Sequence, residues 1–473
     1  MKSIYCFILN KFKILTSKIL FIKWSIEDKQ RFIMNLIWGS VAAFILHFAY
    51  LTGIGQQMIN TAYDYLVVKD FIRSVVHGKE SEPVSDHITI IPFDKTTYTN
   101  NRNGGYWTPR ELLGKVIIKS LKQDSKVVLV DFFFNKPVPI LYNNGNIINE
   151  NTLFLSMLRE AVIIAKKKKA VIIIPWVNHK LDNDFSTQYS KIINENKNVI
   201  KLASPLVYKS SIDNKVRHTN FFEHISLNDK NLIVFSMPLL AFIYHSYGIQ
   251  KGDKIIKEIE INIINSKKER KKKQEFEIFS SINIYSQTTW QECIPARYKY
   301  RIIPRKELKK FGKCNDPLFD KKIRAESFIQ YDDSKPLFNN KIVLIGSTFK
   351  DIGDIHSTPL GNMPGIYIIA NSLNMLLKGQ QIKQENIVKW LLLIVWIIVS
   401  AYIFAIITNG WEIIVLFFLI VIINTPTSTL LFSKYGIFID FWLPSTIMGI
   451  RSNISLIENS VSNFLNRKAK NEN

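Results

Sequence analysis

The chain has 473 residues, a formal net charge of +23 and 47% hydrophobic residues. At roughly 150 residues per domain this length would suggest two or three globular domains, but long uncharged runs near both ends favour a membrane protein with one large domain. The charge alone does not predict nucleic-acid binding, because the lysine-rich runs at 165–170 and 266–277 lack the interleaved aromatic residues on which bases stack, and they are interpreted as solvated loops.

The first predicted element is a transmembrane helix at 32–51, a run of 20 residues without a formal charge. About 20 apolar residues are needed for a helix to cross the bilayer core. The run starts too far from the N-terminus for a removed signal peptide, because the lysine-rich segment 1–31 precedes it. We predict that 1–31 is cytoplasmic, since short flanks rich in Lys and Arg stay on that side.

Four short apolar runs in the following block, 56–386, predict strands. They are ITIIPF before Asp94, KVVLV before Asp131, AVIIIPW, and KIVLIG before Ser347. Continuous β-branched runs of this length are typical of strands buried on both faces. We therefore predict an extracytoplasmic α/β domain, with a parallel or mixed sheet covered by helices.

A helix is predicted between the first two strands, because TPRELLGKVIIKSLKQDS has apolar residues at helical spacing. Thr108 is its candidate N-cap and Pro109 its candidate first residue. This strand–helix–strand unit would place Asp94, Asp131 and Ser347 at the carboxyl ends of their strands. Open α/β sheets usually bind ligands at that edge.

The stretch GDIHSTPLGNMPG, which starts at Gly353, is predicted to be a turn-rich loop over the same edge. It leads into an apolar helical run that ends at Gly379, a candidate glycine C-cap. Asp354 and His356 would lie beside the strand ends. A metal or acid/base set is one interpretation, but Asp and His two residues apart lack the i, i+4 spacing of H-E-x-x-H. The alternative is that His356 is a hydrogen-bonded turn residue.

We predict a ligand site without a metal, a cofactor or a catalytic residue. Competing structural interpretations are that Asp94 and Asp131 cap turns or pair with Arg110, and that Trp107 covers a turn or belongs to the core. The predicted ligand-binding residues are Asp94, Trp107, Arg110, Asp131, Ser347, Asp354, His356 and Thr358.

Beyond the large block, three more transmembrane helices are predicted, at 390–408, 413–432 and 436–457. The last contains Asp440 and Arg451, which are tolerated near helix ends. Four spans place both termini in the cytoplasm, including the tail 458–473. Cys293 and Cys314 lie in the outward block and could form a disulfide in an oxidising compartment, which their spacing leaves open.

Several motifs resemble the second type of CHASE domain, the cyclase- and histidine-kinase-associated sensory extracellular family. They are PFDKTTYTNNRNGGYWTPRELL, VVLVDFFFNKP and NNKIVLIGSTFKDIGDIHSTPLGNMPGIYIIANSLNMLLKG. The segment LASPLVYKSSIDNKVRHTNFF is similar to a further family segment, more loosely. The resemblance covers about residues 60–385. It implies an α/β sensor domain outside the bacterial cytoplasmic (inner) membrane, with one N-terminal and about three C-terminal spans.

In that family the last spans commonly lead to a cytoplasmic cyclase or kinase domain, whereas only 458–473 follow here, too few residues for such a core. We therefore expect a non-enzymatic sensor of an unknown signal that acts through a separate output protein of the cyclase, kinase or protease type, with homo-oligomerisation possible. Two alternatives stay open: a structural or docking component of a cell-envelope complex, and an extracytoplasmic hydrolase.

Overall fold

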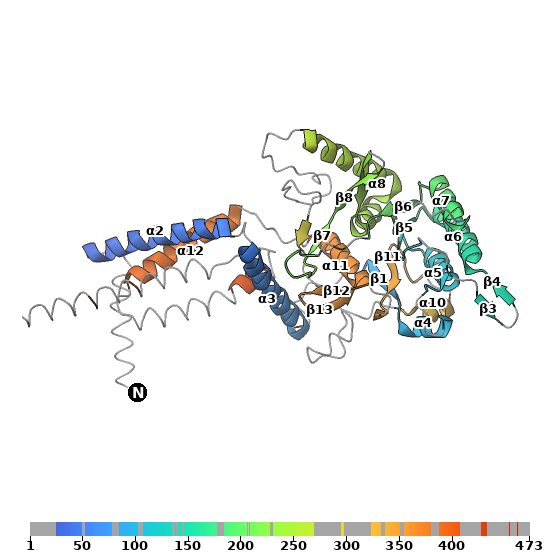
Figure 1. The fold of residues 1–473 in the computed structure, drawn as a ribbon, viewed down its shortest axis with the longest axis horizontal. Coiled ribbons are helices and arrows are strands. Elements are labelled where there is room, and N and C mark those ends of the chain that lie inside the picture. The colour runs from blue at the N-terminus through green and yellow to red at the C-terminus, as the bar shows by residue number, and fades with distance from the viewer. Residues whose placement is uncertain are drawn as a thin grey trace, which may run out of the picture. The chain divides into compact units, whose positions relative to one another are not determined.

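The structure is a computed structural model, and its internal contacts divide the chain into two compact units, Phe71–Ile382 and a flanking unit of Met1–Asp70 with Lys383–Asn473 (Figure 1). Each is described by itself. The residues that the structure describes are 25–49, 53–77, 85–102, 107–134, 138, 141–143, 146–176, 184–205, 207, 209–227, 230–268, 295–297, 323–332, 336–350, 354–379, 387–406, 427–432, 454 and 461.

A five-stranded parallel sheet forms the centre of the larger unit. Its spatial order is β1 (Ile88–Phe93), β11 (Ile342–Ser347), β2 (Val127–Asp131), β5 (Val171–Pro175) and β6 (Ile200–Ala203). Every neighbouring pair is parallel, and β1, β5 and β11 are buried along their whole length. The four predicted strands and the α/β class are confirmed, and the sheet is parallel rather than mixed.

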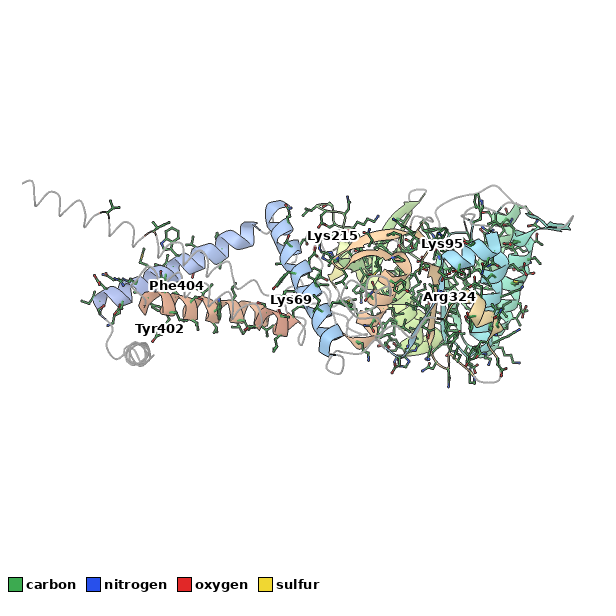
Figure 2. The ribbon with its side chains drawn as sticks, turned by 90° about the horizontal axis from the view of Figure 1, so that it is seen from below. Lys69, Lys95, Lys215, Arg324, Tyr402 and Phe404 are labelled. Carbon is green, nitrogen blue, oxygen red and sulfur yellow. The ribbon has the colours of Figure 1, made fainter. Side chains whose placement is uncertain are left out.

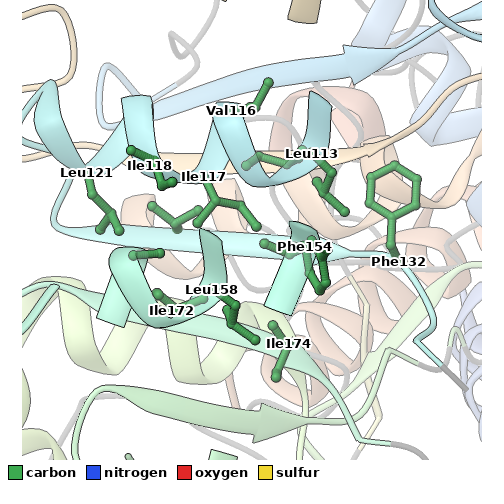
Figure 3. Close-up of a cluster of buried hydrophobic side chains, with 14 of the residues drawn as sticks. Leu113, Val116, Ile117, Ile118, Leu121, Phe132, Phe154, Leu158, Ile172 and Ile174 are labelled. Atoms are coloured by element: carbon green, nitrogen blue, oxygen red, sulfur yellow. The ribbon is translucent and has the colours of Figure 1, made fainter. Parts of the chain in front are cut away.

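One face of the sheet shares a hydrophobic core with residues of α5 (Arg110–Lys122), α6 (Glu150–Lys168), α7 (Asp184–Glu195) and α10 (Ala325–Gln330). Figure 3 shows the part of this core to which α5 and α6 contribute. Helices α5 and α6 approach closely at Gly114, where an added Cβ would come within 2.6 Å of the Met157 sulfur. The predicted helix is confirmed, but it begins at Arg110 with Pro109 in the N-cap position and no side-chain cap. The proposed N-cap at Thr108 was therefore wrong by one residue.

The opposite face is covered by α8 (Met237–Lys268) and α11 (Gly365–Lys378), which also pack against each other. Helix α8 lies on β2 and β5 and is bent at Gly248, whose φ is 73°. Helix α11 lies on β11 and β1, and its residues from Gly365 to Leu376 are all buried. It ends at Gly379 in the left-handed conformation, as the glycine C-cap prediction required.

The remaining elements of this unit are short. Helix α4 (Lys95–Arg102) follows β1 directly. The antiparallel pairs are β3 (Leu141–Asn143) with β4 (Asn146–Ile148), β8 (Phe222–Leu227) with β9 (Lys230–Phe235), β7 (His218–Asn220) with β10 (Pro295–Arg297), and β12 (Ile355–Thr358) with β13 (Gly361–Pro364). The last pair corrects the prediction of a turn-rich loop, because the IHSTPLGNMP part of that stretch forms a β-hairpin closed by a turn after Thr358.

The flanking unit contains α2 (Ile26–Ala49), α12 (Ile387–Ile406) and most of α3 (Gly53–His77). Helix α2 packs along α12, with Phe32 and Tyr402 edge to face at 6.4 Å. Within the described residues, no helix combines the length and apolar character needed to cross a membrane. The four transmembrane helices stay predictions. Most of the last two, 413–432 and 436–457, lies outside the described residues, as do Cys293 and Cys314.

Candidate functional site at the carboxyl edge of the sheet

The carboxyl ends of three neighbouring strands meet where the sequence predicted a site. Strand β11 lies between β1 and β2, so that Phe93 is paired with Ser347 and Gly346 with Asp131. Asp94 follows Phe93 directly. A sequence far downstream thus supplies the central strand of this edge, and the three predicted residues lie at adjacent strand ends.

Asp131 is on the α8 and α11 side of the sheet. Side chains alternate between the faces of a strand, and Val128 and Val130 of β2 belong to the core under α5 and α6. Leu129 and Asp131 therefore face the other way, on the same side as Gly346. Gly346 lets α11 approach closely, since an added Cβ would lie 2.9 Å from the Ile366 side chain.

The first residue of α11 lies against a carboxylate. The backbone N–H of Gly365 donates to the carbonyl oxygen of Asp354 at 3.0 Å, and a Cβ added at Gly365 would overlap the Asp354 side chain. Only glycine leaves room for the carboxylate here. A negative charge at a helix N-terminus is favourable, because it faces the positive end of the helix dipole.

Asp354 is joined to His356 across the start of the hairpin. The His356 Nε2 and the Asp354 Oδ1 are 2.9 Å apart, with the imidazole side chain 13% exposed and the carboxylate 40% exposed. The carboxylate oxygen only accepts, so Nε2 carries the hydrogen in this contact. The other ring nitrogen, Nδ1, is buried, and within the described part of the chain it has no hydrogen-bond partner. The pair has the composition of an acid/base dyad as well as that of a hydrogen-bonded turn.

Asp131 and Asp354 act on each other electrostatically. Burial raises the pKa of the Asp131 carboxyl well above its usual range, and the negative charge of Asp354 raises it further. Two carboxylates in this relation favour a shared proton or a positively charged ligand group. Among the described residues, however, no group of three or more His, Cys, Asp or Glu side chains is arranged to hold a metal ion.

Asp94 has a structural role in addition to its place at the edge. Its Oδ1 accepts hydrogen bonds from the backbone N–H and the hydroxyl of Thr97, at 3.1 and 3.3 Å, and so caps α4. Its Oδ2 lies 3.5 Å from the exposed Arg324, labelled in Figure 2 beside Lys95. Burial raises the pKa of Tyr367 on α11 to about 12, and the negative charge of Asp94 contributes to this rise.

Arg110 contacts the start of α6, helix α7 and Phe134, whose ring centroid lies 5.9 Å from its guanidinium carbon. Its pairing with Asp94 or Asp131 stays a prediction. Its backbone N–H donates to Glu150 at 2.9 Å and its guanidinium to Asn151 at 2.5 Å. The guanidinium carbon lies 4.2 Å from the ring centroid of Phe185, a cation–π contact. At 2% exposed, Arg110 joins α5, α6 and α7.

The remaining predicted residues are divided between turns and the surface. Ser347 accepts a hydrogen bond from the backbone N–H of Phe349 at 3.2 Å. Thr358 donates to the carbonyl oxygen of Gly361 at 2.6 Å and closes the hairpin turn. Both are buried. Trp107 is exposed in the segment before α5, which disagrees with a core position.

One supporting segment was not among the predicted site residues. The backbone N–H of Val216 donates to the Ser357 carbonyl at 2.8 Å, which attaches residues 209–217 to β12. That segment is held by Arg217, whose guanidinium donates two hydrogen bonds to Asp213 at 2.7 and 2.5 Å. The sequence signal that could have indicated this segment is the spacing of Asp213 and Arg217, four residues apart in SSIDNKVR.

Three comparisons with known proteins bear on the whole chain. A family model described as the CHASE2 domain matches residues 41–406, which confirms the resemblance drawn from the sequence motifs. No curated protein matches the chain, and no solved structure does.

Proposed function

The chain belongs to the CHASE2 domain family, and on this premise we propose that its sensory domain detects a signal at the Asp131–Asp354–His356 edge and passes it on through α11. The family implies a signalling sensor with an extracytoplasmic sensory domain. The transmembrane anchoring, the site of detection, the route and the separate output protein are our proposals.

The observation that carries the proposal is the position of α11. Its first residue lies against the Asp354 carboxylate, and its last turn leads through residues 380–386 into α12. A ligand that separates or bridges the two carboxylates would change the charge at the start of α11. Because α11 is buried from Gly365 to Leu376, a shift there must be transmitted along the helix or be taken up by repacking.

The energy required is within reach of a few contacts. Moving a two-state equilibrium from 1:99 to 99:1 takes about 5.5 kcal/mol of differential binding. Hydrogen bonds to charged groups contribute roughly 1.5–3 kcal/mol each. Two to four such bonds to Asp131 and Asp354, made in one state only, would suffice.

A second candidate function is an extracytoplasmic hydrolase. The hydrogen bond between Asp354 and His356, next to the protonatable Asp131, is the arrangement that favours it. A hydrolase would lose turnover on Asp354→Asn, whereas a sensor would lose only its response. An activity screen of the full-length wild-type protein and this variant tests this possibility.

The proposed sensor role is tested by isolating the full-length protein from membranes at native expression with mild crosslinking, and identifying the captured proteins by mass spectrometry. A cyclase, kinase or protease that is captured by the wild type, and whose activity changes in Asp354→Asn, is the expected result. Glu160→Gln, an exposed carboxylate on α6, is the matched control. Capture of envelope structural proteins alone would overturn the sensor role and favour a docking component.

A further inference from the structure

Two imidazoles are in contact at the amino edge of the sheet, opposite the candidate site. His87 immediately precedes β1, and His245 lies on α8. Their ring centroids are 4.8 Å apart and their planes are inclined by 54°. Both residues belong to the larger unit.

His245 is buried with one of its two nitrogens unsatisfied. The residue is 7% exposed. Its Nε2 is 2.9 Å from the carbonyl oxygen of Asn340, so the neutral ring carries its hydrogen there and donates it. Its Nδ1 is buried and has no hydrogen-bond partner among the residues that the structure describes. A second proton, on Nδ1, would find no acceptor among those residues, and a buried donor left unpaired is costly.

The same ring connects the starts of two strands to α8. Asn340 is the turn residue that leads into β11, with φ at 55°. The carbonyl oxygen of His87 accepts a hydrogen bond from the backbone N–H of Ile342, the first residue of β11, at 2.7 Å. Two residues before His87, the N–H of Ser85 donates to the side chain of Asn374 on α11 at 2.8 Å. Movement of the His87–His245 contact would therefore affect the first residues of strands β1 and β11.

The charges around His245 oppose its protonation. Burial is the main cause that lowers its pKa; the hydrogen bond to Asn340 acts in the other direction, and the positive charges of His87 and Lys126 lower it further. Helix α8 packs against α11, β2, β5 and β9, and β5 carries no ionisable residue. The ionisable residues on the other three are Tyr367, Lys378, Asp131 at the far end of β2, and Lys230.

We propose that the His87–His245 contact is a proton-sensitive device of the sensory domain: in mild acid, protonation of the buried His245 separates the two rings and loosens the starts of β1 and β11 from α8. It goes beyond the proposed function, since it needs neither a ligand at the carboxyl edge nor an output protein. A domain that faces the outside is directly exposed to the pH of the medium.

The sign of the effect follows from linkage. A histidine whose pKa is lower in the folded than in the unfolded state stabilises the fold fully above the unfolded value, about 6.5. That contribution is lost as the pH falls from about 6.5 toward the folded value. In this interval a single such group changes the opening equilibrium by up to about tenfold per pH unit.

The test measures amide hydrogen exchange of the full-length protein in detergent at residues 85–93 and 340–347, from about pH 8 to about pH 5, corrected for intrinsic exchange rates. We expect wild-type protection to fall by up to about tenfold per pH unit below about 6.5. His245→Gln, which keeps an N–H donor for Asn340 but does not titrate, should show a flat profile. Glu160→Gln, an exposed carboxylate on α6, is the control and should behave as wild type.

A flat wild-type profile, or a His245→Gln profile as steep as that of wild type, would overturn the proposal. If His245→Gln does not fold, exchange of the ring C2 hydrogen, followed by mass spectrometry in the wild type and in His87→Gln, gives the pKa of His245 directly. A wild-type value below about 6.5 that rises in His87→Gln supports the proposal; a value at or above about 6.5, or one unchanged in the variant, contradicts it.

Discussion

Replacing Asp213 by Asn tests whether a buried ion pair holds the hairpin of the candidate site. The Arg217 side chain is 1% exposed and Asp213 is 33% exposed. Removing one partner of a fully buried pair costs about 3–5 kcal/mol, because the other charge stays buried and loses that partner's compensation. Since a third of Asp213 faces solvent and is screened, we expect a smaller loss, about 2–3 kcal/mol.

The assay is thermal unfolding of the full-length protein in detergent, compared among variants. A loss of this size corresponds to a fall of about 4–10 °C in a large domain. Glu160→Gln removes the carboxylate of an exposed pair, 51% exposed and 3.3 Å from Lys122, and should change stability by less than about 0.5 kcal/mol. Adding Arg217→Met to Asp213→Asn should recover much of the loss, since no buried charge then remains.

The same pair predicts a pH dependence. Hydrogen bonds from Arg217 hold the pKa of Asp213 at about 2. Its stabilising contribution is therefore complete above the ordinary Asp value, about 3.9, and is lost as the pH falls through about 2.

If Asp213→Asn unfolded at the same temperature as Glu160→Gln, the argument that the buried Arg217 needs this partner would be refuted.

Three further predictions concern the edges of the sheet. Gly365→Ala should displace the Asp354 carboxylate and lower the unfolding free energy by about 1–2 kcal/mol, with faster amide exchange in β12; wild-type exchange would contradict the crowding at α11. Asp131→Asn should have an unfolding temperature no lower than that of wild type at about pH 8, and any excess over wild type should shrink near pH 5. The reason is that a raised carboxyl pKa costs stability only where the group ionises. A difference in unfolding temperature that is the same at both pH values would contradict this. Asn374→Ala should cost about 1–3 kcal/mol in denaturant unfolding by leaving the buried Ser85 N–H unpaired, and a loss below about 0.5 kcal/mol would argue for a water in its place.

The strands were predictable because each is a continuous β-branched run, and the end of α11 because Gly379 has a strong local preference for the left-handed conformation. The hairpin at Ile355 was missed because His356, Ser357 and Thr358 have no alternating apolar pattern. Its strand form depends on pairing with β13 and on the hydrogen bond from Val216, and neither is visible in a local window.

The site was only partly predictable for a similar reason. Asp131 and Asp354 could be placed at one edge from topology alone. The position of Arg110 could not, because its partners are Asn151 and Phe185, and the choice among several acceptors of one guanidinium depends on how α5, α6 and α7 pack. The coupling of Asp131 to Asp354 likewise depends on burial, which sequence does not give.

The position of β11 between β1 and β2 constrains how the domain can be made. Ile88 pairs with Ile342 across more than 250 intervening residues, and β2 reaches β1 only through β11. Contacts between such distant residues form late and slowly, because closing the loop between them costs conformational entropy first. A chain delivered from its N-terminus therefore exposes the facing edges of β1 and β2 until β11 emerges. Those edges are the part of this domain most in need of protection from aggregation during biogenesis.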